Sequence, residues 1–578
     1  MTTEWLNESE LTEKEFTSWP AEDQKLYRAK GLWLGVSLWQ QLKSVAKHRL
    51  GQTALTDCRG ALSYAELTER SEYLARGFYQ LGLRLGDRAV IHLPNSVEFY
   101  LSFFALLRLG VQPVLALPAH RESELDYFCQ FTQAKILISA NQGDFNLFKA
   151  AEYLAGHQAR PEFIVSSGSV DNPPCRVLQL SAIAELGQDM PADILPSESE
   201  LMSQPFAFFQ LSGGTTGVPK LIPRTHDDYL YSILAGNEVC RFNAQTRYLC
   251  VLPAAHNFPL SSPGVLGALY AGGTAVLSPD PSVSTVFSYI SQYQINVTAV
   301  VPPIVVLWLQ QVEKEGSQAL ASLQLLQVGG ARLSSELARR IEPELNCRLQ
   351  QVFGMAEGLV NYTRLDDPIE EVIQSQGRPV SAYDQLRIVN EQGTDVAAGE
   401  AGALLVKGPY TIRGYFKAAA INQRSFTADG YYMTGDQVCL TEAGNLQVIG
   451  REKDQINRGG EKIAAEEIEN YLLTHPDIAN AALIAVPDNT FGEKSCAVIV
   501  PKDPQSHSLK PHLLKKFLRE QHLAHFKIPD YIEFIAKLPT TAVGKIDKKS
   551  LQAIYSKQFS ATNKEPYGHS KTSFVSDY

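Results

Sequence analysis

Short apolar runs alternate with longer amphipathic stretches along most of the first 360 residues. The runs at 88–93 and 246–252 have the length and composition of buried strands. The stretch that begins at Ser63 has the period of a helix, with Glu66 at the spacing of an N-terminal capping box. Strands that alternate with helices predict an α/β fold of mostly parallel, helix-covered sheets.

The pattern changes twice toward the C-terminus. From 376 to 449 the chain consists of short apolar segments separated by glycine-rich turns, which predicts a β-rich subdomain. After 450 a second unit begins, with a predicted helix, apolar strands at 481–486 and 495–500 and a basic amphipathic helix at 513–523. We therefore expect a large N-terminal domain over 1–450, including helices within the first 50 residues, and a small α+β domain over 454–556. Residues 557–578 are polar and poor in aliphatic side chains, and we expect them to be disordered.

Composition narrows the class of protein. The chain has 578 residues, too many for one hydrophobic core, and its apolar content of 44% and charged content of 20% are ordinary for a globular protein. A net charge of −10 argues against a nucleic-acid binder that works through bulk positive charge. The 8 cysteines form no CxxC pair, which favours free thiols in a reducing compartment. The acidic N-terminus lacks an apolar core, and no run approaches the ~18 apolar residues of a membrane span, so we expect a cytoplasmic protein.

A glycine- and hydroxyl-rich loop follows the predicted strand at 205–211. Its residues include Ser212, Gly213, Gly214, Thr215, Thr216, Gly217 and Lys220. Glycines let the backbone turn tightly, and backbone N–H groups, hydroxyls and an ammonium all suit phosphate oxygens. No glycine stands directly before the lysine, so this is not a Walker loop. Taken alone, the loop fits a flexible polar turn as well as a phosphate site.

Four further motifs follow in sequence order. They are Phe353-Gly-Met-Ala-Glu357, Tyr432-Met-Thr-Gly-Asp436, Gly450-Arg451 with Asn457–Lys462, and Pro539–Asp547. Together with the glycine loop they resemble the motifs of the acyl-adenylating enzymes, the superfamily of acyl-CoA synthetases, peptide-synthetase adenylation domains and luciferases. The resemblance covers roughly residues 30 to 555. It implies that 451–453 is a hinge, with Lys453 as the pivot, and that 454–556 is a mobile lid.

The resemblance implies attack of a carboxylate on the α-phosphate of ATP. Both reactants are anionic, so a catalyst must neutralise their repulsion and hold them in line. By resemblance, Lys545 is the cation that bridges the carboxylate and the α-phosphate, and Glu357 helps to hold Mg²⁺, a hard cation that prefers oxygen ligands. Without the resemblance, Lys545 reads as a solvated lysine in a turn, and Glu357 as an acidic residue at a helix N-terminus.

The same resemblance assigns the nucleotide contacts. Asp436 accepts hydrogen bonds from the ribose hydroxyls, and Arg451 lies nearby. The remaining adenine- and ribose-binding positions are Gly329, Gly330, Ala331, Val352 and Phe353. The glycines let the adenine and the acyl group approach the backbone. Considered by themselves, Asp436 is an aspartate in a turn and Lys453 is a surface lysine in a linker.

The stretch 255–264 indicates which class of carboxylic acid is activated. It closely resembles the 2,3-dihydroxybenzoate and salicylate adenylating ligases of siderophore synthesis. In that branch His256 lies by the carboxylate and acts in catalysis, Asn257 bonds the 2-hydroxyl and Phe258 flanks the ring. Val352 and Val360 line the ring, and Ser262 faces ring position 3. By their residues alone, Asn257 and Ser262 could equally cap the loop around Pro259 and Pro263.

Ser262 and Val360 favour 2,3-dihydroxybenzoate over salicylate. Serine can hydrogen-bond a 3-hydroxyl, whereas salicylate enzymes often carry cysteine there and a bulkier residue at the position of Val360. The chain departs from the branch at Phe258, where tyrosine is common, and at Asp227, where asparagine is.

The resemblance predicts that the enzyme makes aroyl-AMP and pyrophosphate from the aryl acid and Mg·ATP. It then transfers the aroyl group to the phosphopantetheine thiol of an aryl carrier protein. Transfer to coenzyme A and a non-catalytic scaffold that binds nucleotide or carrier are the alternatives. A Rossmann-type oxidoreductase is disfavoured because no strand-associated G-x-G-x-x-G is present.

Overall fold

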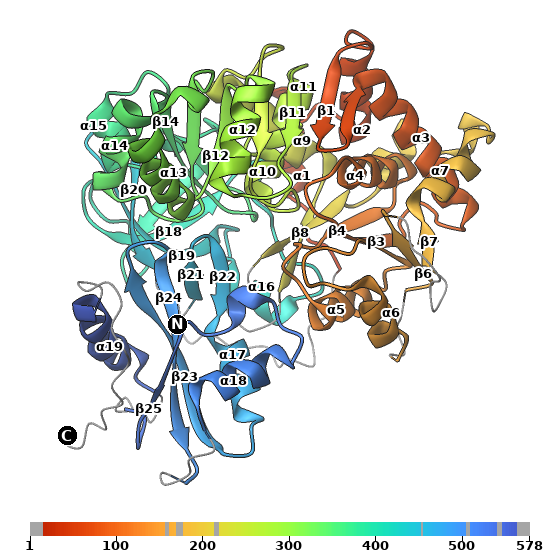
Figure 1. The fold of residues 1–578 in the computed structure, drawn as a ribbon. Coiled ribbons are helices and arrows are strands. Elements are labelled where there is room, and N and C mark those ends of the chain that lie inside the picture. The colour runs from red at the N-terminus through yellow and green to blue at the C-terminus, as the bar shows by residue number, and fades with distance from the viewer. Residues whose placement is uncertain are drawn as a thin grey trace. The chain divides into compact units, whose positions relative to one another are not determined.

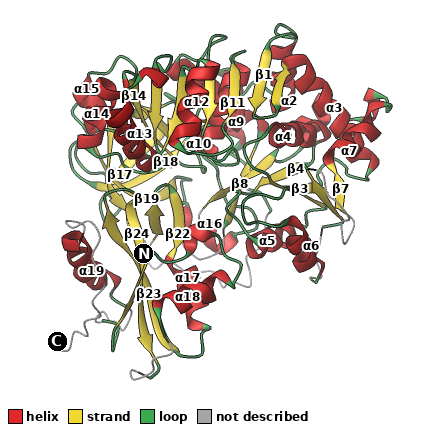
Figure 2. Cartoon of the chain, viewed as in Figure 1, coloured by secondary structure: helices red, strands yellow, loops and turns green. Residues whose placement is uncertain are grey.

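The structure is a computed structural model that describes residues 15–156, 161–168, 177–212, 219–451, 455–503, 509–539 and 546–562. The described residues divide into two compact units. The larger contains those of 15–212 and 220–451, and the smaller contains Pro219 and those from 455 onward. Figure 1 shows the course of the chain and Figure 2 its helices and strands.

A seven-stranded sheet occupies the first half of the larger unit. Its described strands, in spatial order, are β7 (Val177–Gln179), β6 (Phe163–Ser166), β5 (Ile136–Ser139), β3 (Arg88–His92), β4 (Gln112–Leu115), β8 (Phe208–Ser212) and β9 (Lys220–Arg224). All neighbours are parallel except β8 and β9, which pair antiparallel. Ser212 ends β8 and lies opposite Lys220, the first residue of β9. The glycine loop therefore joins two antiparallel strands, and its lysine stands on a strand.

Helices cover both faces of this sheet (Figure 1). They are α3 (Tyr64–Gln80), α4 (Val97–Leu109), α5 (Glu122–Thr132), α6 (Leu147–Ala155), α7 (Leu180–Gln188) and α8 (Glu198–Ser203). Successive strand residues point to opposite faces. Ile91 accordingly packs in the core that includes α3 and α4, whereas Val90 packs with α5 and α6. The capping box predicted at Ser63 and Glu66 begins α3 and is confirmed.

A nine-stranded sheet forms the second half of the larger unit. Its described strands, in spatial order, are β16 (Arg378–Pro379), β15 (Val360–Tyr362), β14 (Arg348–Gly354), β13 (Leu325–Val328), β12 (Val297–Val300), β10 (Arg247–Cys250), β11 (Thr274–Leu277), β1 (Thr53–Asp57) and β2 (Gly60–Ser63). The six strands from β14 to β1 are parallel, and the edge pairs are antiparallel.

One apolar core joins the two sheets. Ile91 of β3 and Ala275 of β11 belong to the same buried cluster. The helices around the second sheet are α2 (Leu38–Ala46), α9 (His226–Cys240), α10 (Asn257–Ser261), α11 (Gly264–Tyr270), α12 (Val283–Tyr293), α13 (Pro302–Glu315), α14 (Ser335–Leu345) and α15 (Ile369–Gln374). Short 3₁₀ turns lie at Ala192–Ile194, Gln318–Leu320 and His525–Lys527. The predicted α/β class is confirmed.

The β-rich subdomain is a four-stranded antiparallel sheet, as predicted. It consists of β17 (Gln385–Val389), β18 (Gly402–Lys407), β19 (Tyr432–Leu440) and β20 (Leu446–Arg451), with α16 (Ala419–Ser425) between β18 and β19. The predicted N-terminal helices include α1 (Ala21–Ala29), which this subdomain helps to anchor. The indoles of Trp19 and Trp33, on either side of α1, donate to the carbonyls of Gly408 and Pro409 at 3.1 and 3.0 Å. Asp227 accepts from Arg28 and from Gly35 N, both at 2.8 Å, so its carboxylate holds the same segment.

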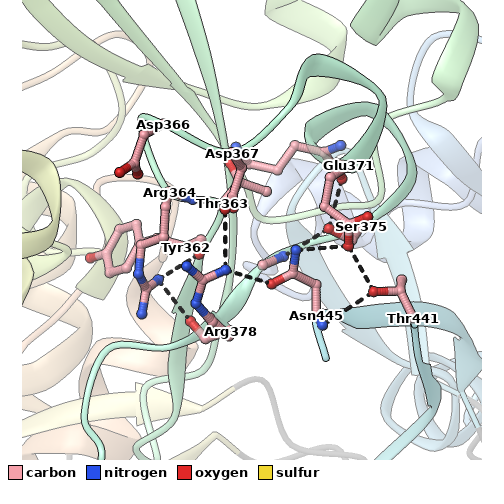
Figure 3. A network of polar contacts seen from close by, with 12 residues as sticks. Tyr362, Thr363, Arg364, Asp366, Asp367, Glu371, Ser375, Arg378, Thr441 and Asn445 are labelled. Carbon is pink, nitrogen blue, oxygen red and sulfur yellow. Dashed lines mark hydrogen bonds and ion pairs between the residues drawn. The ribbon is translucent and has the colours of Figure 1, made fainter. Parts of the chain in front are cut away.

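A polar network ties the β19–β20 hairpin to the nine-stranded sheet (Figure 3). Glu371 of α15 accepts hydrogen bonds from Thr441 at 2.7 Å and from Asn445 Nδ2 at 2.8 Å. Asn445 Oδ1 accepts from Arg378 at 3.1 Å, and Arg378 also pairs with Asp367 at 3.2 Å. The network therefore fixes the position of the hairpin against β16 and α15.

The smaller unit has a twisted, mostly antiparallel sheet flanked by helices. Its strands are β21 (Gln455–Arg458), β22 (Glu461–Ala464), β23 (Ile478–Asp488), β24 (Gly492–Pro501) and β25 (Tyr531–Phe534), and its helices are α17 (Ala465–Leu473), α18 (Pro511–Arg519) and α19 (Lys548–Thr562). Residues 513–523 were expected to be helical, but α18 begins with Pro511 at its first turn and ends at Arg519.

The expected disorder from 557 is wrong for its first six residues. Helix α19 continues to Thr562, and Phe559 stacks on Tyr531 with ring centroids 4.2 Å apart. Aromatic packing onto β25 supplies the apolar contact that composition alone did not indicate. The rest of 557–578 lies outside the described residues. No helix in the described part of the chain has both the length and the apolar character needed to cross a bilayer.

Candidate active site

Helix α10 carries the residues predicted to bind the acid. His256 caps its N-terminus, because its Nδ1 accepts a hydrogen bond from Phe258 N at 3.2 Å. In a neutral imidazole this leaves the proton on Nε2, so that nitrogen is a donor. The loop before α10 is held by Asn95, whose Oδ1 accepts from Ala254 N at 2.7 Å and whose Nδ2 donates to Leu252 O at 3.0 Å. No local pattern marks Asn95 in the sequence.

Asn257 is buried and its side-chain oxygen is already paired. Oδ1 accepts hydrogen bonds from the hydroxyls of Tyr229 at 2.9 Å and Ser261 at 3.2 Å. Tyr229 in turn accepts from Gln210 Nε2 at 3.2 Å. Burial raises the pKa of Tyr229 to about 12, so its hydroxyl keeps its proton at neutral pH. Tyr229 and Gln210 were not singled out from the sequence, where they read as ordinary core residues.

The structure brings Gly329, Phe258 and Val352 together. A Cβ at Gly329 would lie 2.8 Å from the carbonyl oxygen of Val352 and 3.1 Å from the ring of Phe258. Such distances exclude any side chain, so the glycine permits a close approach of three segments. Val360 lies opposite Gly354 in the β14–β15 register and belongs to the same buried cluster as Phe258 and Val352.

Ser262 completes this group from the end of α10. It is buried, with 4% of its surface exposed. Burial raises the pKa of Tyr362, and a side-chain hydrogen bond with Ser262 opposes that rise. Ser262 is therefore a neighbour of the buried Tyr362 side chain. The five residues predicted to bind the acid are Asn257, Phe258, Ser262, Val352 and Val360, and all are buried.

Tyr415 connects two residues predicted to bind Mg·ATP. Its hydroxyl donates to Glu357 Oε1 at 2.8 Å and lies 2.9 Å from the hydroxyl of Tyr432. The Lys220 ammonium stands 4.8 Å from the centre of the Tyr415 ring, a cation–π contact. Burial raises the pKa of the Tyr415 hydroxyl, which keeps it a donor to the carboxylate. The sequence did not identify Tyr415.

Asp436 lies on β19, four residues after Tyr432, and only 2% of its surface is exposed. Its backbone N–H donates to Thr434 Oγ1 at 3.0 Å, and Gly435 takes a φ of 74° that glycine tolerates. In the β19–β20 register Asp436 lies opposite Arg451, which agrees with their predicted proximity along the backbone.

The other predicted nucleotide residues follow two parallel strands. Gly329, Gly330 and Ala331 come directly after β13, and Val352 and Phe353 stand near the end of β14. Because β13 and β14 are paired and parallel, these positions lie at the same edge of the sheet. Gly330 is exposed and has a φ of 79°.

Several predicted residues lie outside the described part of the chain. They are Gly213, Gly214, Thr215, Thr216, Gly217, Lys453 and Lys545. Their roles stay predictions, and of Arg451 the backbone alone is described.

The surroundings of Glu357 fit a magnesium ligand. Glu357 is buried, and its Oε1 accepts a hydrogen bond from the Tyr415 hydroxyl rather than from a cation. The ring of the same tyrosine contacts the Lys220 ammonium. Among the described residues no three His, Cys, Asp or Glu side chains gather as a metal group. A single carboxylate suits Mg²⁺, which takes one or two protein carboxylates and completes its shell with phosphates and water.

Comparison with known proteins agrees with this arrangement. The family model for AMP-binding enzymes matches residues 42–416, and that for the AMP-binding enzyme C-terminal domain matches 467–545. The chain therefore belongs to the AMP-binding enzyme family, whose members use ATP.

Similar proteins indicate which kind of AMP-binding enzyme this chain resembles. The vibriobactin-specific 2,3-dihydroxybenzoate-AMP ligase of Vibrio cholerae is 51% identical over 93% of this chain and 97% of that protein. The 2,3-dihydroxybenzoate-AMP ligase of Bacillus subtilis is 47% identical over 95% and 99%. The apo structure of Mycobacterium smegmatis MbtA is 41% identical, has a TM-score of 0.71 and is matched over 93% of this chain and 98% of that one. The predicted resemblance to acyl-adenylating enzymes is confirmed.

Proposed function

We propose that the protein is a 2,3-dihydroxybenzoate–AMP ligase of siderophore biosynthesis. The observation that carries the proposal is the pairing of two buried polar side chains, Asn257 and Ser262, with an apolar group of Phe258, Val352 and Val360. In such a site the apolar side chains would pack against a flat aromatic ring, and the polar side chains would form hydrogen bonds with its hydroxyls. A buried hydrogen-bonding group discriminates strongly, because an analogue without the hydroxyl leaves it unpaired. The names and high identities of the two ligases above support the same acid.

In the first reaction an oxygen of the carboxylate attacks the α-phosphorus of ATP, and the bond to the β-phosphate breaks. The products are aroyl-AMP and pyrophosphate. The half-buried His256, with Nε2 as a donor, would orient the carboxylate, and Lys220 would meet phosphate oxygens. Lys545 would neutralise the charge that accumulates between the two anions. Asp436 would hold the ribose hydroxyls.

Glu357 would hold Mg²⁺ together with phosphate oxygens. The ion would neutralise phosphate charge and so favour attack by an anion. The bond from Tyr415 fixes one carboxylate oxygen, which orients the other.

In the second reaction a thiol sulfur attacks the carbonyl of the adenylate, AMP leaves, and the thiol proton passes to solvent. The acceptor would be the phosphopantetheine thiol of an aryl carrier protein. The unit from 454 onward would rotate about Lys453 between the two reactions, so that Lys545 leaves the site and the thiol enters.

The test is aryl-acid-dependent exchange of pyrophosphate into ATP with 2,3-dihydroxybenzoate, salicylate and benzoate. We expect the highest kcat/KM with 2,3-dihydroxybenzoate. A lead for salicylate would keep the class and overturn the role of Ser262. A product assay with carrier protein against coenzyme A separates a carrier-loading ligase from an aryl-CoA ligase. No exchange with any acid, in folded protein that binds ATP, would favour a non-catalytic scaffold.

A further inference from the structure

A continuous line of buried hydrogen bonds leads from the seven-stranded sheet to the acid site. Gln210 lies on β8, Tyr229 on α9 and Asn257 at the start of α10. The bonds run from Gln210 Nε2 to the Tyr229 oxygen at 3.2 Å, and from the Tyr229 hydroxyl to Asn257 Oδ1 at 2.9 Å. All three side chains are buried, with 0–9% of each residue exposed.

The donors fix the direction of this line. The amide nitrogen of Gln210 can only donate, so the Tyr229 oxygen accepts from it and the Tyr229 proton turns to Asn257. The Ser261 hydroxyl also donates toward Asn257 Oδ1 at 3.2 Å, but it has the Asn257 carbonyl oxygen at 3.1 Å as a second acceptor. Tyr229 is therefore the stronger determinant of the amide orientation.

Because Oδ1 of Asn257 is paired to the Tyr229 and Ser261 hydroxyls, the planar amide turns Nδ2 away from them, and in the proposed site its hydrogens would face the acid. An ortho-hydroxyl on a benzoate donates its own proton to the neighbouring carboxylate. Its oxygen is then an acceptor, which matches an Asn257 amide that presents N–H. An ortho-amino group is the opposite case, because an aromatic amine donates readily and accepts poorly.

We propose that Tyr229 is a positioning residue that locks Asn257 with Nδ2 toward the ortho substituent and so selects ortho-hydroxy acids over ortho-amino acids. The proposal rests on the proposed function. Tyr229 acts through Asn257 and does not itself touch the acid. The competing explanation is that Tyr229 is a core residue whose hydroxyl is merely paired. That role predicts a change in stability and no change in selectivity.

The test uses Tyr229→Phe in the full-length protein. Phenylalanine keeps the ring contacts, an edge-on packing with Phe208 at 4.7 Å and the Arg224 guanidinium at 4.9 Å, and removes the hydroxyl. Pyrophosphate exchange is measured with salicylate and 2-aminobenzoate. We expect the salicylate to 2-aminobenzoate ratio of kcat/KM to fall about threefold to tenfold, mostly through a higher KM for salicylate, as loss of one oriented hydrogen bond implies.

The matched control is Tyr231→Phe. Tyr231 is two residues further along α9, and its hydroxyl lies 2.7 Å from Ser381 Oγ, away from Asn257's bonded partners. This variant loses one partly buried hydroxyl from the same helix and should keep the wild-type ratio of kcat/KM for salicylate to that for 2-aminobenzoate. Thermal unfolding of both variants checks that the fold is retained. If Tyr229→Phe does not fold, Gln210→Met replaces it, because it removes the donor to Tyr229 and should lower the same ratio.

Each outcome decides the proposal. A fallen ratio in Tyr229→Phe or Gln210→Met with an unchanged ratio in Tyr231→Phe supports it. An unchanged ratio in folded Tyr229→Phe, with an active wild type, overturns the positioning role and leaves the ligase function intact. A wild type that activates none of the hydroxybenzoates overturns the proposed function and this inference with it.

Discussion

Ser262 is the residue that we propose discriminates between 2,3-dihydroxybenzoate and salicylate. It stands at the end of α10 and is buried. Replacing it with alanine removes one hydrogen-bond partner for a 3-hydroxyl. We expect Ser262→Ala to lower kcat/KM for 2,3-dihydroxybenzoate about threefold to tenfold and to leave salicylate nearly unchanged. Pyrophosphate exchange with both acids measures the ratio.

Ser322→Ala is the control for this prediction. Ser322 donates to Ile290 O of α12 at 3.2 Å, so its hydroxyl is also paired, but it lies in the turn before β13 and not on α10. It should keep the wild-type ratio. Equal losses for both acids in Ser262→Ala would mean that the serine supports the pocket without reading the 3-hydroxyl.

Tyr415 is predicted to position the metal-binding carboxylate. Tyr415→Phe removes the bond to Glu357 and keeps the ring beside Lys220. We expect on the order of tenfold weaker binding of Mg·ATP, as for other partners of metal ligands, with little change in KM for the acid. Calorimetric titration with ATP, with and without Mg²⁺, measures the affinity. The gain in ATP affinity that Mg²⁺ causes should be smaller in Tyr415→Phe than in the wild type.

Tyr431→Phe supplies the comparison, since its hydroxyl bonds Gln385 at 3.0 Å on the exposed side of the β-rich sheet. That variant should bind Mg·ATP as the wild type does. A Tyr415→Phe protein with an unchanged Mg²⁺ dependence would separate Tyr415 from the metal site.

At the scale of elements, the position of the β19–β20 hairpin depends on Asn445. Its buried side chain bonds both Glu371 and Arg378, as Figure 3 shows. Asn445→Ala leaves the half-buried Glu371 carboxylate and the Arg378 guanidinium each short of one partner. We expect the free energy of unfolding to fall by about 2–3 kcal/mol, with a lower midpoint of thermal unfolding. We also expect a higher KM for ATP, because β19 carries Asp436.

Gln447→Ala is the matched control on β20. Gln447 bonds the carbonyl of Gln374 at 3.0 Å across the same two elements, but this bond is exposed. Loss of this bond should lower the free energy of unfolding by less than about 0.5 kcal/mol. Similar effects of the two substitutions would show that the buried network does not hold the hairpin.

At the scale of the whole molecule, the proposed two-step reaction makes a separable prediction for Lys545. Lys545→Ala should abolish pyrophosphate exchange, because nothing else is proposed to neutralise the attacking carboxylate. It should largely spare transfer from supplied aroyl-AMP to the carrier thiol. Single-turnover assays of each half-reaction test this. Lys549→Ala, an exposed lysine four residues further on, should leave both half-reactions intact.

Loss of both half-reactions to the same extent in Lys545→Ala would argue against use of the small unit in two orientations. The proposed adenylation activity would then be tested only by pyrophosphate exchange in the wild-type protein.

The features that could be predicted from the sequence are those that local patterns encode. The capping box at Ser63 needs only residues three apart, and the alternation of strands and helices needs only the periods of apolar side chains. Asn257, Glu357 and Asp436 are predicted as site residues because each lies within a short motif that carries the resemblance.

The partners of those residues were decided by the tertiary structure. Tyr229 is 28 residues from Asn257, and Tyr415 is 58 residues from Glu357. Each partner is an ordinary buried tyrosine in its own segment, and no local pattern marks it. Gly329 likewise needs to be glycine because the Phe258 ring and the Val352 carbonyl converge on it.

The sequence by itself therefore determined the class of fold, the order of the motifs and the chemistry of their side chains, since these follow from local composition and spacing. Only the tertiary structure decided which buried donors orient Asn257 and Glu357, and that α19 continues to Thr562 by packing on Tyr531. The physical reason is the same in each case. A hydrogen bond or a ring contact between distant segments depends on how strands pair and helices pack, and that geometry is a property of the whole folded unit.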